Sequence, residues 1–320
     1  MKLTHLRDVV AVADRGSLRA AARHLGIAQP AITRSIREIE RELGVALFER
    51  RARGVVMTPL GEVFLRRALA MQNELRLARE EMDQLQGKTT GRVSIALSTV
   101  PHLALLPRAL QPFRARFPDV FLHVAEGLFP SVEPALKDGS IDFYVGPLTE
   151  QPLDKRLAVE ILFENTRVIL GRKGHPLARA KSLKDLADAR WITTAVTLNS
   201  GAELGPVFQS HGLPPPRIEM QAPSALTMIM AAANSDLLMM LPEQWLTFPA
   251  MRELLQPFAV KEPLPAPAIG IVWRARLPLT PAAEFLCDML RRASEHHVAA
   301  RARAAKRLLS ASPAIPDPYR

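Results

Sequence analysis

The stretch SLRAAARHLGIAQPAITRSIREIERE, from Ser17 to Glu42, decides the N-terminal fold. Apolar residues recur at helical spacing on both sides of Gly26, whose missing Cβ suits the left-handed backbone that ends a helix. With Ser17 as N-cap, the first stripe comprises Leu18, Ala21, Ala22 and Leu25. The second stripe comprises Ile32, Ile36, Ile39 and Leu43. The pattern predicts two short amphipathic helices, and a third is expected from Leu3, Leu6, Val10 and Ala13.

Burying the isoleucine stripe leaves polar residues on the outer face of the second helix. These residues are Gln29, Pro30, Thr33, Arg34 and Arg37. Such side chains suit the major groove, where Gln pairs with adenine, Arg pairs with guanine and Thr reaches a base or a thymine methyl. Together with Ser17 they are the expected DNA-contacting residues of a helix-turn-helix. The alternative is an ordinary helical hairpin with a solvated face.

A basic segment follows the hairpin at residues 49–61. It carries Arg50, Arg51 and Arg53 beside a glycine, two valines that favour a strand, and Thr58-Pro59, which favours a new helix start. This pattern predicts a β-wing whose arginines bind the DNA backbone, with Arg53 able to sense the width of the minor groove. A solvated basic turn is the alternative interpretation.

These motifs resemble those of the LysR-type transcriptional regulators. The matching segments are residues 17–22, 29–34, 40–44, 47–50 and 58–61, in that order, with Leu60 where the family usually has alanine. The resemblance extends to about residue 295, and the middle section is most similar to the subgroup that regulates aromatic sulfonate and sugar-binding-protein genes. It implies an N-terminal all-α winged helix-turn-helix, a long linker helix and a two-lobed α/β effector domain similar to periplasmic binding proteins.

Composition and charge agree with this class. The chain has 320 residues, of which 48% are hydrophobic, so it can form hydrophobic cores in more than one domain. Residues 1–67 hold 13 basic and 7 acidic side chains, and residues 291–320 hold 7 and 2, whereas the middle holds 22 and 23. The excess of positive charge that favours nucleic-acid binding therefore lies at the two ends of the chain. The single cysteine, Cys287, is expected to be a buried thiol. The sequence shows neither a signal peptide nor an apolar membrane span, so we expect a cytoplasmic protein.

Residues 58–86 predict the linker helix. Its heptad seam consists of Phe64, Ala68, Met71, Leu75, Ala78, Met82 and Leu85. Such a seam favours a coiled coil with a second copy, although a single helix packed on its own domain is the alternative. A dimer would place two recognition helices on DNA half-sites about one helical turn apart, or a multiple of it. The resemblance to the LysR-type regulators further implies that such dimers can assemble into tetramers.

We expect domains at 1–58 (winged helix-turn-helix), 59–91 (linker and hinge) and 92–295 (effector domain), with a basic helical extension and disordered tail at 296–320. In the effector domain, strand, loop and helix patterns repeat and predict βαβ units of a parallel sheet. Lobe I is assigned to 92–166 and 268–295, and lobe II to 167–267. The segment 98–101 is expected to be a polar loop, followed by a helix over 103–117 and another over 131–138.

Ligands of such sheets lie beyond the carboxyl ends of the strands. The expected effector-binding residues there are Ser98, Thr99, Leu128, Phe129, Ser131, Gly146, Thr197 and Ser224. The hydroxyls and nearby backbone amides suit a small organic anion, a carboxylate or a sulfonate, with Leu128 and Phe129 as an apolar wall. For each hydroxyl the alternative role is N-capping of a helix.

The expected function is therefore a DNA-binding transcriptional regulator controlled by a small-molecule effector. Its expected partners are double-stranded promoter DNA, the effector, further copies of the chain and RNA polymerase, with no membrane and no cofactor. A two-lobed enzyme acting on a small anion is the alternative, but the chain has no Gly-rich phosphate loop and no G-x-S-x-G motif. His296 and His297 are adjacent and cannot share one helix face, so no metal site is expected.

Overall fold

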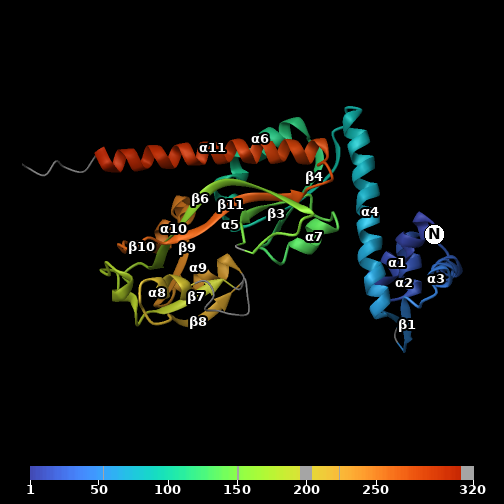
Figure 1. The fold of residues 1–320 in the computed structure, drawn as a ribbon, viewed down its shortest axis with the longest axis horizontal. Coiled ribbons are helices and arrows are strands. Elements are labelled where there is room, and N and C mark those ends of the chain that lie inside the picture. The colour runs from blue at the N-terminus through green and yellow to red at the C-terminus, as the bar shows by residue number, and fades with distance from the viewer. Residues whose placement is uncertain (53, 150, 195–203, 223, 311–320) are drawn as a thin grey trace, which may run out of the picture.

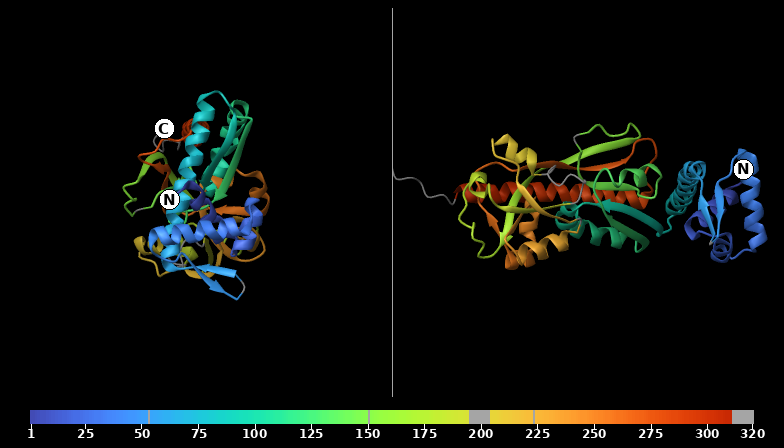
Figure 2. Two further views of the ribbon diagram at one scale, coloured as in Figure 1. Left: turned by 90° about the vertical axis from the view of Figure 1, so that its right-hand side faces the viewer. Right: turned by 90° about the horizontal axis from the view of Figure 1, so that it is seen from below.

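The computed structural model describes residues 1–52, 54–149, 151–194, 204–222 and 224–310. An N-terminal helical domain, one long helix and a larger α/β domain follow one another along the molecule (Figure 1). The long helix stands between the two domains, and the last helix lies along the α/β domain (Figure 2). Within the described ranges, no helix is both long and apolar enough to cross a membrane.

The N-terminal domain is a bundle of three helices with a two-stranded hairpin. Its elements are α1 (Leu3–Arg15), α2 (Leu18–Leu25), α3 (Gln29–Leu43), β1 (Phe48–Arg51) and β2 (Gly54–Met57). The antiparallel hairpin confirms the predicted wing, and its Val55 N–H donates to the Gly16 carbonyl in the turn between α1 and α2 at 2.9 Å. Gly26 ends α2 with a φ of 67°, as the sequence predicted.

Two details of the predicted helical core are wrong. Leu43 lies in the last turn of α3, where it is 40% exposed, and the following Leu47 fills the core instead. On α1 Leu6 is buried as predicted, but Leu3 is 58% exposed, and the buried face continues through Val9 and Val12 rather than Val10 and Ala13. The isoleucine stripe of α3 is buried as predicted.

The linker helix α4 (Pro59–Leu85) begins at the predicted cap. Thr58 Oγ1 accepts the Gly61 N–H at 2.9 Å and donates to the Ala46 carbonyl at 2.8 Å. A Cβ at Gly61 would lie 2.1 Å from the Leu47 carbonyl oxygen, so only glycine allows the helix to approach this closely. In the part of the chain that the structure describes, four of the seven predicted seam residues are exposed, Met82 at 60% and Leu85 at 69% the most, whereas Ala68 is buried and Phe64 packs against the core of the N-terminal domain.

The α/β domain is built on one mixed sheet with the order β4-β3-β5-β11-β6-β9-β7-β8, and β10 pairs with β6. The strands are β3 (Thr90–Leu97), β4 (Asp119–Glu126), β5 (Phe143–Pro147), β6 (Leu157–Arg172), β7 (Arg190–Thr194), β8 (Arg217–Ala222), β9 (Leu237–Pro242), β10 (Leu255–Phe258) and β11 (Pro265–Arg274). The helices are α5 (Thr99–Ala104), α6 (Leu106–Arg116), α7 (Glu133–Lys137), α8 (Gly205–Ser210), α9 (Ala225–Ala233), α10 (Pro249–Leu254) and α11 (Pro281–Ser310), with short 3-10 helices η1 (Leu183–Leu186) and η2 (Glu243–Thr247).

Strand β6 connects the two lobes. Up to Thr166 it pairs with β11, and from Arg167 onward it pairs with β9. The β6–β11 ladder shifts register between Ala266 and Ile269, so the strands are irregular where β6 changes partner. Separate buried clusters lie on the two sides of this point, around β3, α6 and α11 in lobe I and around β7 and β9 in lobe II.

Several predicted details of the α/β domain are wrong. The sheet is mixed, because β11 runs antiparallel to both β5 and β6, whereas β3 pairs in parallel with β4 and β5. The segment 98–101 is not a loop, since α5 begins at Thr99, and a break at Leu105 divides the predicted helix over 103–117. The helix predicted over 131–138 spans only Glu133–Lys137. The first part of β6, residues 157–166, was not predicted to be a strand.

Candidate functional site

The outer face of α3 gathers five of the predicted DNA-contacting side chains. Gln29, Pro30, Thr33, Arg34 and Arg37 line one hollow of about 610 Å³ together with Glu38 and Arg41. Gln29, Pro30, Arg34 and Arg37 are exposed, while Thr33 is half-buried because its Oγ1 donates to the Gln29 carbonyl at 2.9 Å. The surface is therefore polar, cationic and held on a rigid helix.

Arg41 belongs to this surface but was absent from the predicted set. It follows Arg34 and Arg37 at helical spacing and is exposed in the last turn of α3. Within the described residues none of the three arginines forms an ion pair, so their guanidinium groups are available to phosphates or bases. Because Arg37 and Arg41 follow Arg34 by three and seven residues, helical spacing alone would have placed Arg41 on the same face.

The wing is positioned by α3 itself. Glu40 Oε1 accepts the backbone N–H groups of Leu47 and Phe48 at 2.8 and 3.2 Å, which fixes the start of β1. Arg50 and Arg51 are exposed on β1, and Arg51 pairs with Glu49 at 3.0 Å. This exposed pair is weak, because both partners are solvated, and a phosphate can replace Glu49. Arg53 lies outside the described residues.

Ser17 has a structural role that the sequence also predicted. Its Oγ accepts the Ala20 N–H at 3.0 Å and caps α2. A DNA contact by the same hydroxyl stays a prediction.

In lobe I, four of the predicted effector residues, Ser98, Thr99, Phe129 and Gly146, lie near the carboxyl ends of β3, β4 and β5. Ser98 follows β3, and its Oγ is buried with no hydrogen-bond partner in the described part of the chain. A Cβ at Gly146 of β5 would lie 2.9 Å from the Ser98 Cβ and 2.1 Å from the Tyr144 hydroxyl. Phe129 packs edge-on against the Tyr144 ring, with 5.1 Å between centroids. Thr99 is half-buried in the first turn of α5.

Tyr144 was missed by the sequence analysis, because it lies within an apolar strand and looks like a core residue. Its ring is fully buried, and its hydroxyl donates only a long hydrogen bond of 3.4 Å to the Pro147 carbonyl. Burial raises the pKa of this hydroxyl above its ordinary value, against an opposing backbone hydrogen bond from Phe129, so it stays a neutral donor. Ser98, Tyr144 and Gly146 thus form a small polar group in an apolar setting.

The remaining predicted effector residues differ in what their side chains do. Ser224 caps α9, since its Oγ accepts the Thr227 N–H at 3.4 Å, so the N-capping alternative holds for this residue. Ser131 is exposed and donates to the Leu128 carbonyl, and Leu128 itself is half-buried. Among the described residues no hydrogen bond joins Ser224 to the Ser98 group. Thr197 lies outside the described residues.

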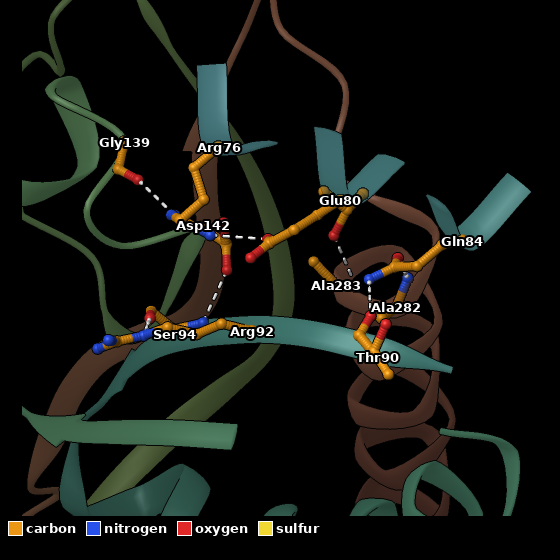
Figure 3. A network of polar contacts seen from close by, with 11 residues as sticks. Arg76, Glu80, Gln84, Thr90, Arg92, Ser94, Gly139, Asp142, Ala282 and Ala283 are labelled. Atoms are coloured by element: carbon orange, nitrogen blue, oxygen red, sulfur yellow. Dashed lines mark hydrogen bonds and ion pairs between the residues drawn. The ribbon is translucent and has the colours of Figure 1, made fainter. Parts of the chain in front are cut away.

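The linker helix is tied to lobe I by buried polar contacts (Figure 3). Gln84 Nε2 donates to the Thr90 carbonyl at 3.2 Å, and its Oε1 accepts the Ala282 N–H at 2.9 Å, so one side chain joins α4, β3 and α11. Asn73 Nδ2 donates to the Asp138 carbonyl at 2.9 Å, and Glu74 pairs with Arg274. These contacts join lobe I directly to the helix that carries the DNA-binding domain.

A buried carboxylate lies under this junction. Asp142 Oδ2 accepts the Ser94 N–H at 2.7 Å, and the side chain faces Arg76 of α4 (Figure 3). Burial raises the pKa of Asp142 to about 6, although the Ser94 hydrogen bond and the charges of Arg76 and Arg274 oppose the shift. Arg76 is held in turn by Glu80, 2.7 Å away on the same helix.

Comparison with known proteins finds a family match for each of the two domains. Residues 3–62 match the bacterial regulatory helix-turn-helix proteins of the lysR family, and residues 86–295 match the LysR substrate binding domain. The SDS degradation transcriptional activation protein of a Pseudomonas species is 30% identical over 294 residues, covering 90% of this chain and 95% of that protein. The transcriptional regulator TdcA of Escherichia coli K12 is 26% identical over 296 residues, covering 92% and 94%.

Solved structures show the same fold. Full-length CbnR complexed with its target DNA matches with a TM-score of 0.67 at 19% identity, covering 92% of this chain and all of that one. The two family matches lie on the two domains that the fold separates, and the relatives are named as transcriptional regulators. The chain therefore belongs to the LysR family of DNA-binding transcriptional regulators.

Proposed function

We propose that the effector of this regulator is a small organic anion, a carboxylate or a sulfonate, bound beside Ser98 between the two lobes. The observation that carries the proposal is the buried Ser98 hydroxyl, which has no partner among the described residues and lies next to Gly146 and Tyr144. A buried hydroxyl without a hydrogen bond is unfavourable by about 1 to 3 kcal/mol, and a ligand oxygen accepting from it would remove that cost. The neutral Tyr144 hydroxyl is a second donor beside it.

The surroundings of this group suit the apolar part of such a ligand. Phe129 is buried against Tyr144, and Leu128 is half-buried one residue before it. Ligand pockets generally combine an apolar wall with a few polar groups that fix orientation. One relative is named for the degradation of SDS, an alkyl sulfate, which is also an organic anion with an apolar part. A closer kinship with regulators of aromatic sulfonate or sugar-binding-protein genes is part of this proposal.

In the DNA-bound state, we assign base contacts to the α3 face and backbone contacts to the wing. The position of Gln29, Thr33, Arg34 and Arg37 on one face of α3 supports their entry into the major groove, and the exposure of Arg50 and Arg51 supports contacts with phosphates. Regulators of this family bind DNA and an effector and act as oligomers. The exposed seam of α4 supports a dimer through this helix, with tetramers, RNA polymerase contact and a cytoplasmic location as further parts of the proposal.

The DNA part is tested with fluorescence anisotropy on the promoter next to the gene and on a scrambled duplex. Arg34→Ala should weaken promoter binding by about 1 to 3 kcal/mol and relax specificity at one base position. Arg51→Ala should weaken both duplexes alike and reduce the dependence of affinity on salt. Equal loss on both duplexes for Arg34→Ala would overturn its role in base recognition.

The effector part is tested by thermal shift with benzoate, benzenesulfonate and neutral benzamide at matched concentrations. The two anions, but not benzamide, should raise the melting temperature of the wild type. Ser98→Ala should abolish the shift, whereas Ser131→Ala, which removes an exposed hydroxyl on a neighbouring loop, should keep it. An equal shift in Ser98→Ala and wild type would contradict the site. The two-lobed enzyme is set aside, because the relatives are named as regulators.

A further inference from the structure

Helix α11 runs the length of the α/β domain (Figures 1 and 2). Its first turns belong to lobe I, where Ala283, Leu286, Leu290 and Ala293 are buried in the lobe I core. Beyond Ala293 the helix leaves that core and passes along the segment 163–166 of β6, just before β6 changes its pairing from β11 to β9. The distal part of α11 therefore lies over the connection between the lobes.

Arg301 binds both sides of this connection. Its Nη1 donates to the Glu164 carbonyl at 2.9 Å, and its Nη2 donates to Thr166 Oγ1 at 3.3 Å. Its Nε forms an ion pair with Glu243 of η2, which belongs to lobe II. Thr166 Oγ1 donates to the same carboxylate at 2.8 Å, so Arg301, Thr166 and Glu243 form a closed ring of contacts.

A second contact lies one helical turn earlier. The His297 ring packs on Phe163 with 5.0 Å between centroids, and its Nε2 lies 3.2 Å from Gln244 Nε2, which can donate to it. Gln244 also donates to Asn165 Oδ1 at 3.0 Å, and both of these side chains are buried. Each residue of the segment 163–166 thus contacts α11 or η2.

From this geometry we infer that His297 and Arg301 form a hinge brace that holds the two lobes at their present angle. Hinge motion of two lobes concentrates backbone rotation in a few residues where the connecting strands are irregular, and the shifted β6–β11 ladder is such a place. Arg301 spans the Glu164 carbonyl of β6 and the Glu243 carboxylate of lobe II. Rotation about the segment 163–166 therefore breaks at least one of its charge-assisted bonds.

The brace gives the C-terminal helix a regulatory role. A ligand shifts a conformational equilibrium only through its different affinity for the two states. An effector that needs a different lobe angle must overcome the brace, so its apparent affinity depends on Arg301 although Arg301 is far from Ser98 in the sequence. This last step rests on the proposed effector site, whereas the brace itself does not.

Hydrogen exchange of the full-length protein tests the brace without an effector. Arg301→Ala should speed exchange of the backbone amides at 163–167 about tenfold, as expected when a local opening loses one charge-assisted bond. Arg303→Ala is the control, because it removes an arginine charge two residues further along α11, where the side chain is exposed and no ion pair is found among the described residues. The swap Arg301→Glu with Glu243→Arg should restore the protection only in part, because it rebuilds the ion pair but a carboxylate at position 301 cannot donate to the Glu164 carbonyl.

Lobe motion is then measured by single-molecule energy transfer between cysteines introduced at Arg108 in lobe I and Lys184 in lobe II. Both positions are exposed, and the natural Cys287 is buried, so the labels attach at the introduced sites. Arg301→Ala should shift or broaden the transfer distribution, and Arg303→Ala should leave it unchanged. If Arg301→Ala matches the wild type in both measurements, the brace is refuted. If it changes both while benzoate and benzenesulfonate do not bind, the brace stands and the proposed effector fails.

Discussion

Asp142→Asn is expected to stabilise the protein at neutral pH, and the effect should vanish in acid. The carboxylate is buried under the contact between α4 and lobe I, and burial raises its pKa from 3.8 to about 6. In the unfolded chain the pKa returns to its ordinary value. The folded state therefore holds more protons than the unfolded state between about pH 4 and pH 6, so this group makes stability fall as pH rises through that range.

The magnitude follows from the shift. A pKa raised from 3.8 to about 6 corresponds to about 3 kcal/mol of unfavourable free energy for the ionised side chain in the folded state. Asparagine keeps an oxygen that can accept the Ser94 N–H and carries no charge. Above pH 6 the variant should therefore gain up to about 3 kcal/mol, and below pH 4 it should match the wild type.

Urea unfolding at pH 7.5 and pH 4, followed by circular dichroism at one protein concentration, measures this difference. Glu126→Gln is the control, because it makes the same chemical change, from carboxylate to amide, at an exposed position on strand β4 of the same sheet. A gain for Asp142→Asn that is the same at both pH values, or no gain at pH 7.5, would refute the reasoning that burial of the charge dominates over Arg76 and Arg274.

Three further outcomes test the linker and the effector site. Gln84→Ala removes the side-chain partner of the buried Ala282 N–H of α11 and of the Thr90 carbonyl of β3, and should cost about 1 to 3 kcal/mol, measured by thermal unfolding. Gly146→Ala places a methyl against the Tyr144 hydroxyl and should destabilise lobe I by about 1 to 3 kcal/mol, so an unchanged melting temperature would contradict the packing. Met82→Glu with Leu85→Glu should reduce self-association in sedimentation without unfolding, because both side chains are exposed in the single chain.

Local features were predictable because they depend on neighbouring residues. The turn at Gly26, the cap at Thr58 and the buried isoleucines of α3 follow from helical period and capping chemistry. The same period failed at the ends of helices. Leu43 fits the stripe but lies in the last turn of α3, just before the left-handed Gly44 that ends the helix, and its side chain is 40% exposed.

For the candidate effector site, the sequence predicted which loops take part but not which side chains in them are free to bind a ligand. Ser98 and Ser224 look alike in sequence, since each precedes a helix. The structure separates them, because Ser224 caps its helix whereas the Ser98 hydroxyl is buried without a partner. Tyr144 escaped notice because an aromatic residue in an apolar strand indicates a core position, and only its distance to Gly146 reveals the hydroxyl beside Ser98.

By itself, the sequence determined the winged helix-turn-helix, the linker helix and the presence of strands and helices in an α/β effector domain, because period, caps and turns are properties of adjacent residues. Only the tertiary structure decided that Gln84 joins α4 to lobe I and that Arg301 spans the connection between the lobes. Those contacts join residues more than a hundred positions apart. Their geometry depends on how the whole sheet twists and packs, which no local pattern encodes.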